Sequence, residues 1–336
     1  MTARGWSPAS HRRPSLGVAT IRVSVPGNIL LLGEYAITRP GGVGIAVAVE
    51  PRVHATATAT AAAAGAGTGT AGALSGVMRS EQLGAEPGSL LRAVADVCGE
   101  ALGWQITVDS TGLAGERGKR GLGSSAAVAV AATALLLRVR DGAVPRVERV
   151  MELAGVAHRA WQGGTGSGYD VATSTLGGLV QIEQRPGGLP RAHRLPADPP
   201  LLVVIEGARS LDTRSSLAAF DAWRRQSPRR AAAFVRRSAR LTSAFVAGGE
   251  RKRRRVLGAG AAALVALGRR IDIDMEPDEL SARLAPLRRA GWRAKAVGAG
   301  GELAVALSPP GVPADEVARA GAVGVQVSAE GVRWES

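Results

Sequence analysis

Apolar and polar residues alternate near the start of the chain in the manner of a half-buried β-strand. The alternation covers 20–25 and stops at Pro26-Gly27, and a second apolar run follows at 29–32. A third run, over 44–50, predicts another strand. The composition then becomes low-complexity over 55–76, where we expect an edge strand followed by a mobile loop.

Six further elements are predicted in the first half from helical spacing of apolar residues and from short alternating runs. They are helices over 88–102, 124–138 and 146–162, a helical turn beginning at Asp170, and strands over 105–109 and 179–184.

The second half combines strands with arginine- and alanine-rich helices. Its predicted elements are a strand at 201–205, helices within 213–270 that break at Pro228 and Gly248-Gly249, a helix at 277–290, a turn at 298–301 between two strands, and a βαβ-like tail.

The Pro- and Gly-rich stretch 186–200 predicts a boundary between two domains. Strands and helices mix on both sides of it without the regular βα repeat of a doubly wound sheet. We therefore expect an α+β protein of two domains, 19–187 and 200–336, preceded by a flexible leader at 1–18. The glycine-rich loops are expected to line the cleft between the domains.

The composition excludes several classes of protein. Of 336 residues, 46% are hydrophobic and 21% charged, as in a globular protein rather than a disordered one. The single cysteine, Cys98, excludes an intrachain disulfide framework and a thiolate-rich zinc site, and the four scattered histidines disfavour a histidine metal site. No apolar run reaches the ~20 residues of a membrane span. We expect a cytoplasmic protein with no membrane partner.

The net charge of +14 comes almost entirely from arginine, since lysine occurs three times. Three explanations remain open: a genome-wide preference for arginine over lysine, a basic cleft for phosphorylated small molecules, or nucleic-acid binding. Only 3% of residues are aromatic, which leaves few platforms for stacking bases, so we expect no nucleic-acid partner. The basic run 251–255 is interpreted as a solvated helix face.

The segment 121–127, with sequence GLGSSAA, stands at the start of an apolar helix. Glycines allow close approach of a ligand to the backbone, and the unpaired amides and dipole of a helix start favour an anion such as phosphate. A glycine turn with a serine N-cap is the alternative. The segment lacks the GxxxxGK[ST] pattern of a P-loop, and no strand directly precedes it as a dinucleotide-binding fingerprint requires.

Two other glycine-rich segments are candidates for the same site. The first, 163–168, leads into Asp170, which is either a helix N-cap or a base for a substrate hydroxyl. The second, 298–301, is either a tight hairpin turn or part of a binding cleft.

Taken in order, the segment from Pro26-Gly27 to Ala36, GLGSSAA at 121–127 and GAGG at 298–301 resemble the GHMP kinase superfamily. The resemblance covers about residues 20–308. The sequence of 157–172 is most similar to that of phosphomevalonate kinases. It implies two α+β domains with ATP, Mg²⁺ and a phosphoryl acceptor in the cleft between them.

The resemblance also implies roles for residues of this chain. The phosphate-binding residues would be Gly121, Leu122, Gly123, Ser124, Ser125 and Ala126, with Ser124 and Ser125 helping to hold Mg²⁺. The catalytic residues would be Asp170, Lys119 and Arg120. The substrate-binding residues would be Asn28, Glu34, Tyr35, Ser167, Gly168, Ser210, Thr213, Gly298, Gly300 and Gly301.

Two departures from the family pattern bear on activity. Asn28 stands where the family usually has lysine, and GAGG runs directly into Glu302-Leu303 where a further glycine and an aspartate are expected. The expected function is an ATP-dependent kinase that converts 5-phosphomevalonate into 5-diphosphomevalonate in isoprenoid biosynthesis, as a monomer or homodimer. The alternatives are a GHMP kinase acting on an alcohol such as mevalonate, and a catalytically degenerate binding protein of the same fold.

Overall fold

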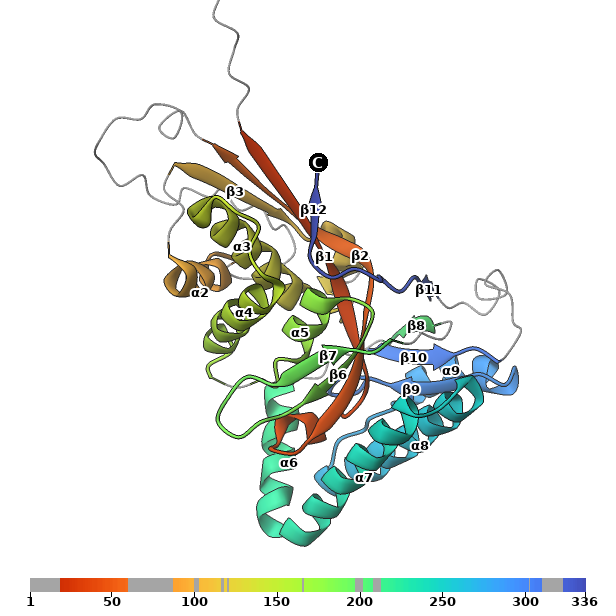
Figure 1. Ribbon diagram of the computed structural model, residues 1–336. Helices are drawn as coiled ribbons and strands as arrows, with labels where there is room; N and C mark the ends of the chain where they lie inside the picture. The colour runs from red at the N-terminus through yellow and green to blue at the C-terminus, as the bar shows by residue number, and fades with distance from the viewer. Residues whose placement is uncertain are drawn as a thin grey trace, which may run out of the picture.

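The computed structural model describes residues 19–59, 87–99, 103–115, 118–119, 121–164, 166–196, 202–207, 213–301, 303–309 and 323–336. The predicted leader and most of the low-complexity stretch lie outside these ranges. Two sheets, each accompanied by helices, form the molecule (Figure 1).

The first sheet has the order β12-β1-β2-β6-β7, with β3 paired to the far end of β2. Its strands are β1 (Thr20–Leu32), β2 (Val43–Ala59), β3 (Trp104–Asp109), β6 (Leu179–Glu183), β7 (Arg191–Arg194) and β12 (Arg333–Glu335). A small separate hairpin consists of β4 (Ala114–Gly115) and β5 (Gly118–Lys119).

Three predictions in this sheet are corrected by the structure. β1 does not stop at Pro26-Gly27 but continues through it with a shift of register against β2. Residues 55–59 are not an edge strand, because they pair with β1 on one side and with β3 on the other. Strand β7 lies within 186–200, the stretch expected to link two domains, and pairs with β6.

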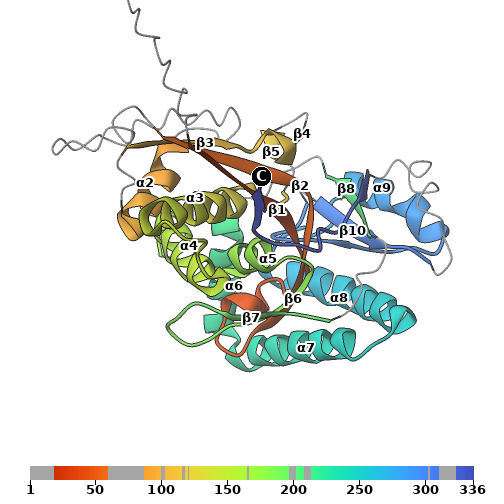
Figure 2. The ribbon, with the colours of Figure 1, turned by 45° about the horizontal axis from the view of Figure 1, so that its top comes forward.

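Four helices lie together beside the first sheet: α2 (Pro87–Cys98), α3 (Ser124–Asp141), α4 (Val147–Trp161) and α5 (Tyr169–Leu176) (Figures 1 and 2). Helix α3 is buried on every side over 126–137, where alanines alternate with larger apolar residues. Small side chains let neighbouring elements approach α3 closely, so the predicted phosphate-binding segment opens onto the most buried helix of this half. All four were predicted, with boundaries that differ by a few residues.

The second sheet has the order β11-β8-β10-β9. Its strands are β8 (Leu202–Glu206), β9 (Arg293–Ala296), β10 (Leu303–Leu307) and β11 (Val323–Val325). The helices of this half are α6 (Thr213–Gln226), α7 (Pro228–Val246), α8 (Glu250–Ile271) and α9 (Asp278–Arg289), with two 3₁₀ turns elsewhere, Ala36–Thr38 and Thr111–Leu113. The breaks at Pro228 and at Gly248-Gly249 are confirmed.

The two halves are joined by a hydrophobic cluster that spans both and by a C-terminal strand that pairs in the first sheet. Buried side chains of β1, α3, α7, α8 and β10 belong to a single cluster. After β11, the chain returns to the first sheet, where β12 pairs with β1. The last residues, expected to lie in the C-terminal domain, therefore join the first sheet. The expected α+β class is confirmed. None of the described helices combines the length and apolar character needed to cross a bilayer.

Candidate active site

The predicted phosphate loop ends at the N-terminus of α3. Gly123 is the N-cap, in the left-handed conformation with φ 70°, and no side chain caps the first turn. The amides there keep their hydrogen-bonding capacity for a ligand, and the helix dipole favours an anion. A Cβ at position 123 would collide with the amide of Asn28, so only glycine fits this turn.

Strand β1 contacts the 121–127 loop through its backbone. The backbone N–H of Asn28 donates to the carbonyl of Leu122 at 2.9 Å. Gly27 makes this approach possible, since a Cβ there would lie 2.8 Å from the Leu113 side chain and 2.9 Å from the Leu122 carbonyl. The shift of register at Pro26/Gly27 thus marks the point where β1 contacts the loop.

Asn28 itself lies under the loop and not in a ligand cavity. Its side chain is 1% exposed, and Nδ2 donates to the Ser174 hydroxyl at 3.0 Å. Its Oδ1 is buried without a hydrogen-bond partner among the described residues. Asn28 therefore connects the loop to α5, and the expectation that it contacts the acceptor is not supported by its position.

His158 connects the phosphate loop to Asp170. The imidazole is 2% exposed, with Nε2 3.1 Å from the Ser125 hydroxyl and Nδ1 3.8 Å from Asp170 Oδ2. Asp170 occupies the first turn of α5, where its Oδ1 accepts a hydrogen bond from the Val171 N–H at 2.9 Å. Helix α4 thus brings a loop serine and the candidate base to opposite sides of one ring.

Either tautomer of His158 fits the contact with Ser125, since each ring nitrogen can donate or accept a hydrogen bond. In the tautomer with the proton on Nδ1, facing Asp170, the unprotonated Nε2 accepts a hydrogen bond from the Ser125 hydroxyl. The Ser125 oxygen then keeps its lone pairs for a metal ion or another donor.

A cavity of about 220 Å³ lies next to Asp170, between β1, α5, α6 and the 298–301 turn. Six predicted residues line it: Glu34, Tyr35, Ser167, Asp170, Thr213 and Gly298. Leu30, Ile37 and Leu217 add apolar surface, and Gln162 and Ser216 add polar groups that were not predicted. A larger open depression of about 630 Å³, beside Arg52 and Arg333, contains none of the predicted site residues.

Glu34 forms a buried ion pair with Lys295 through its Oε1. Lys295 Nζ also donates to the Ala296 carbonyl at 2.9 Å. Burial raises the pKa of Glu34 and lowers the pKa of Lys295, against the attraction between the two charges. The pair joins the end of β1 to β9 beside the cavity.

Tyr35 connects the 298–301 turn to the first half of the molecule. Its hydroxyl donates to the Ala299 carbonyl at 3.0 Å, its ring lies 5.5 Å from that of Phe220, and burial raises its pKa to about 12. Gly300 sits against Met275, with φ 103° and no room for a Cβ at normal distance. The turn is therefore fixed between Tyr35 and Met275.

The remaining predicted residues fall into two groups. Gly168, Gly300 and Gly301 shape backbone but do not line the cavity. Arg120 and Ser210, and the side chain of Lys119, lie outside the described residues. Sequence reasoning missed the contacts of His158 and Lys295, although both stand inside or beside the glycine-rich motifs.

The described residues suit Mg²⁺ bound mainly through phosphates. They contain no cluster of three or more His, Cys, Asp or Glu side chains that would form a complete metal cage. Mg²⁺ in phosphoryl-transfer sites takes one or two protein ligands, substrate phosphates and water. The Ser125 hydroxyl, in the first turn of α3, offers one such protein ligand.

Comparisons with known proteins agree with this geometry. Residues 89–178, which include the phosphate loop, His158 and Asp170, match the family model described as the GHMP kinases N terminal domain. No curated protein matches the chain. This match covers 90 of the 336 residues, so the likeness to the GHMP kinases in sequence is shown for this segment.

Solved structures show the same fold along the whole chain. A Lin0012 protein from Listeria innocua aligns with a TM-score of 0.76 and 18% identity, covering 95% of this chain and 100% of that one. Streptococcus pneumoniae phosphomevalonate kinase, in complex with phosphomevalonate and AMPPNP, aligns at 0.67 and 17%, covering 94% and 100%. L. major mevalonate kinase, in complex with R-mevalonate, aligns at 0.67 and 19%, covering 92% and 93%.

Proposed function

We propose that this protein transfers the γ-phosphoryl group of ATP to a small acceptor bound in the 220 Å³ cavity. One observation carries the proposal. His158 lies between Ser125, in the uncapped first turn of α3, and Asp170, which lines the cavity. Phosphoryl transfer needs positioning and charge neutralisation more than covalent chemistry, and this site offers both.

Each group in the site has a distinct task in this proposal. The amides of the first turn of α3 hold phosphate oxygens. Asp170 orients the acceptor oxygen and takes its proton where it has one. His158 holds the Ser125 hydroxyl and the Asp170 carboxylate in place. A bound Mg²⁺, held by Ser125 and the phosphates of ATP, would neutralise charge on the transferred group.

We propose 5-phosphomevalonate as the acceptor. Two observations support this acceptor. The sequences of 157–172 and of Gly33-Glu34-Tyr35-Ala36 resemble those of phosphomevalonate kinases, and the chain shares a fold with the Streptococcus pneumoniae enzyme. A phosphate monoester is largely ionised near neutral pH, because its second pKa is ~6. Such an acceptor places little demand on a base, which makes asparagine at position 28 tolerable.

An alcohol such as mevalonate is the second candidate, favoured by the lining of the cavity. The described lining contains the carboxylates of Glu34 and Asp170 but no lysine or arginine. A cavity wall without cations suits a neutral hydroxyl better than a phosphate. With an alcohol, Asp170 would have to accept a proton from a poorly acidic group.

The decisive experiment measures ADP release with ATP and Mg²⁺ in the presence of 5-phosphomevalonate, mevalonate, homoserine or galactose. Asp170→Asn and Ser125→Ala are tested beside wild type, and His193→Ala, at an exposed histidine outside the site, is the control. Turnover on 5-phosphomevalonate, lost with Ser125→Ala and retained with His193→Ala, is the expected result.

Other outcomes discriminate among the alternatives. Turnover on mevalonate alone, with Asp170→Asn reducing kcat by about 10²-fold or more, would establish the alcohol acceptor. Binding of ATP without turnover on any acceptor would contradict the kinase proposal and favour a catalytically degenerate binding protein.

A further inference from the structure

The positive charge of the protein is concentrated in one helical hairpin. Twelve of the 42 basic residues, but only one of the 28 acidic residues, lie within 228–271, the stretch that forms α7 and α8. This stretch therefore carries +11 of the net +14. A general preference for arginine over lysine would not remove carboxylates from one hairpin, so a local cause is required.

Ten of the twelve basic side chains of this hairpin are exposed and have no carboxylate partner among the described residues. Elsewhere, several arginines pair with acids, as in Arg39–Asp221, Arg149–Glu152 and Arg288–Glu276. Ten exposed basic side chains of α7 and α8 form no hydrogen bond or ion pair among the described residues. They are Arg229, Arg230, Arg236, Arg237, Arg240, Arg251, Lys252, Arg255, Arg269 and Arg270.

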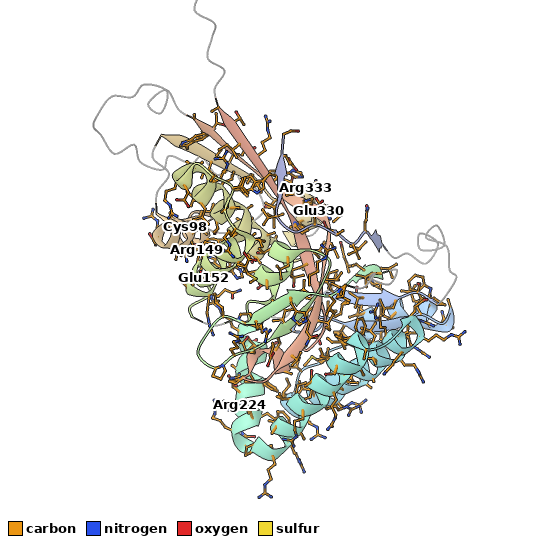
Figure 3. All side chains as sticks on the ribbon, in the orientation of Figure 1. Cys98, Arg149, Glu152, Arg224, Glu330 and Arg333 are labelled. Atoms are coloured by element: carbon orange, nitrogen blue, oxygen red, sulfur yellow. The ribbon has the colours of Figure 1, made fainter. Side chains whose placement is uncertain are left out.

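These residues share one face on each helix, which we call the basic face. On α7, intervals of seven and four residues separate Arg229, Arg236 and Arg240, which places them on one side of the helix. On α8, Arg251 and Arg255 are one turn apart and Arg269 is five turns from Arg251. Helices α7 and α8 lie side by side along one border of the molecule, with side chains pointing outward (Figure 3). Such like charges repel one another unless an anionic partner neutralises them.

A groove of about 220 Å³ opens within the basic face. Its floor consists of Trp223, Phe234, Ala263 and Leu267, and its rim carries Arg230, Arg237 and Arg270. Trp223 and Leu267 are 8% and 2% exposed, so the apolar surface is recessed below the charges.

The shape of this surface selects the kind of partner. A membrane-binding helix needs apolar side chains that protrude into the lipid, whereas here they are recessed. A nucleic acid has phosphates for the arginines but no aliphatic group for the groove. A small amphiphilic anion could meet only the three arginines of the rim, while the remaining seven charges extend along helices about 30 Å long.

We propose that the basic face docks an acidic, amphipathic polypeptide segment of a partner protein. An apolar side chain of the segment fills the groove, and its carboxylates pair with the arginines of α7 and α8. The groove and the acceptor cavity have no lining residue in common, so this inference does not rest on the proposed kinase activity.

The test uses a fluorescent helical peptide of about five turns, with leucines along one side and glutamates beside them. A companion peptide carries alanine in place of each leucine. Fluorescence anisotropy is measured at low and at physiological ionic strength. The leucine peptide is expected to bind at least about tenfold more tightly than the alanine peptide, and both should weaken as salt rises.

Variants distinguish the groove from simple charge attraction. The triple variant Arg230→Glu, Arg237→Glu and Arg270→Glu should lose binding, whereas the charge-matched variant Arg92→Glu, Arg185→Glu and Arg191→Glu, at exposed positions outside the hairpin, should retain it within about twofold. Ala266→Trp, which places a large ring at the groove, should remove the preference for leucine while leaving binding of the alanine peptide unchanged.

Three results would overturn the proposal. The peptides could bind equally well, both triple variants could lose binding equally, or a DNA duplex or phosphatidylserine vesicles could bind more tightly than the leucine peptide. The last result, unaffected by Ala266→Trp, would assign the face to a polyanion or a lipid surface instead.

Discussion

At the scale of single residues, His158 is central to the proposed site, because its buried ring lies between a loop serine and a carboxylate. His158→Ala should lower kcat roughly 10²-fold while changing the affinity for ATP much less, since the amides of α3 do not depend on the ring. His158→Gln, which can bond Ser125, should recover part of the loss. Steady-state kinetics with isothermal titration of ATP separate the two effects.

The control for this prediction is His193→Ala, which should leave both constants unchanged. A loss of ATP affinity equal to the loss of kcat in His158→Ala would contradict the role of positioning and would indicate a general disruption of the loop.

Tyr35 supplies a prediction about pH. Its pKa is raised to about 12 by burial, above the 10.0 of a free tyrosine. The unfolded chain therefore releases this proton first, and the stabilisation is present in full below pH 10 and lost as pH rises toward 12. Two pKa units correspond to about 2–3 kcal/mol. Tyr35→Phe should flatten this part of the pH profile of the unfolding free energy, measured by denaturant titration between about pH 9 and 11.

Tyr169→Phe is the matched control, as Tyr169 is the only other tyrosine of the chain. An equally steep alkaline loss in wild type and Tyr35→Phe would show that the Tyr35 hydroxyl does not carry the effect.

At the scale of elements, the junction of β1 and α3 depends on Gly123. Gly123→Ala should destabilise the protein by about 1–2 kcal/mol for the left-handed backbone alone, and by more through the collision with Asn28. Adding Asn28→Ala should relieve the collision but not the backbone strain. The double variant should therefore be more stable than Gly123→Ala, with both measured by thermal unfolding with and without ATP. A double variant less stable than the single one would contradict this account.

Sequence patterns predicted the elements whose signals are local. The loop at 121–127 and the breaks at Pro228 and Gly248-Gly249 are contiguous runs that specify their own backbone. The continuation of β1 through Pro26-Gly27 could not be predicted, because pairing with β2 overrides the local breaker. Strand β7 has no apolar alternation, and its pairing with β6 alone forms it.

Local sequence patterns could not predict contacts between residues that lie far apart along the chain. Ser125 and His158 are 33 positions apart, Glu34 and Lys295 are 261 apart, and β12 returns to β1 from the far end of the chain. Each partner has an ordinary alternative: His158 as a core histidine, Lys295 as a solvated cation. Only the packing of the helices and sheets selects between these possibilities.

At the scale of the whole molecule, the Glu34–Lys295 pair joins the two halves at the cavity, inside surroundings that disfavour both charges. Glu34→Gln or Lys295→Met alone leaves one buried charge unpaired, which should cost about 3–5 kcal/mol of unfolding free energy. The double variant removes both charges and should be close to wild type in stability, or more stable. The two single effects are therefore expected to be strongly non-additive.

A second double-mutant cycle, at an exposed ion pair, tests whether the non-additivity depends on burial. The exposed pair Arg149–Glu152, within α4, is replaced in the same way by Arg149→Met and Glu152→Gln, and its coupling should stay below about 1 kcal/mol. Denaturant unfolding of all variants gives both coupling energies. Additive effects at Glu34 and Lys295 would mean that water or movement of the two halves relieves the unpaired charge. Strong coupling would instead show that β1 and β9 hold the cavity wall closed as one unit, with no water able to replace the missing partner.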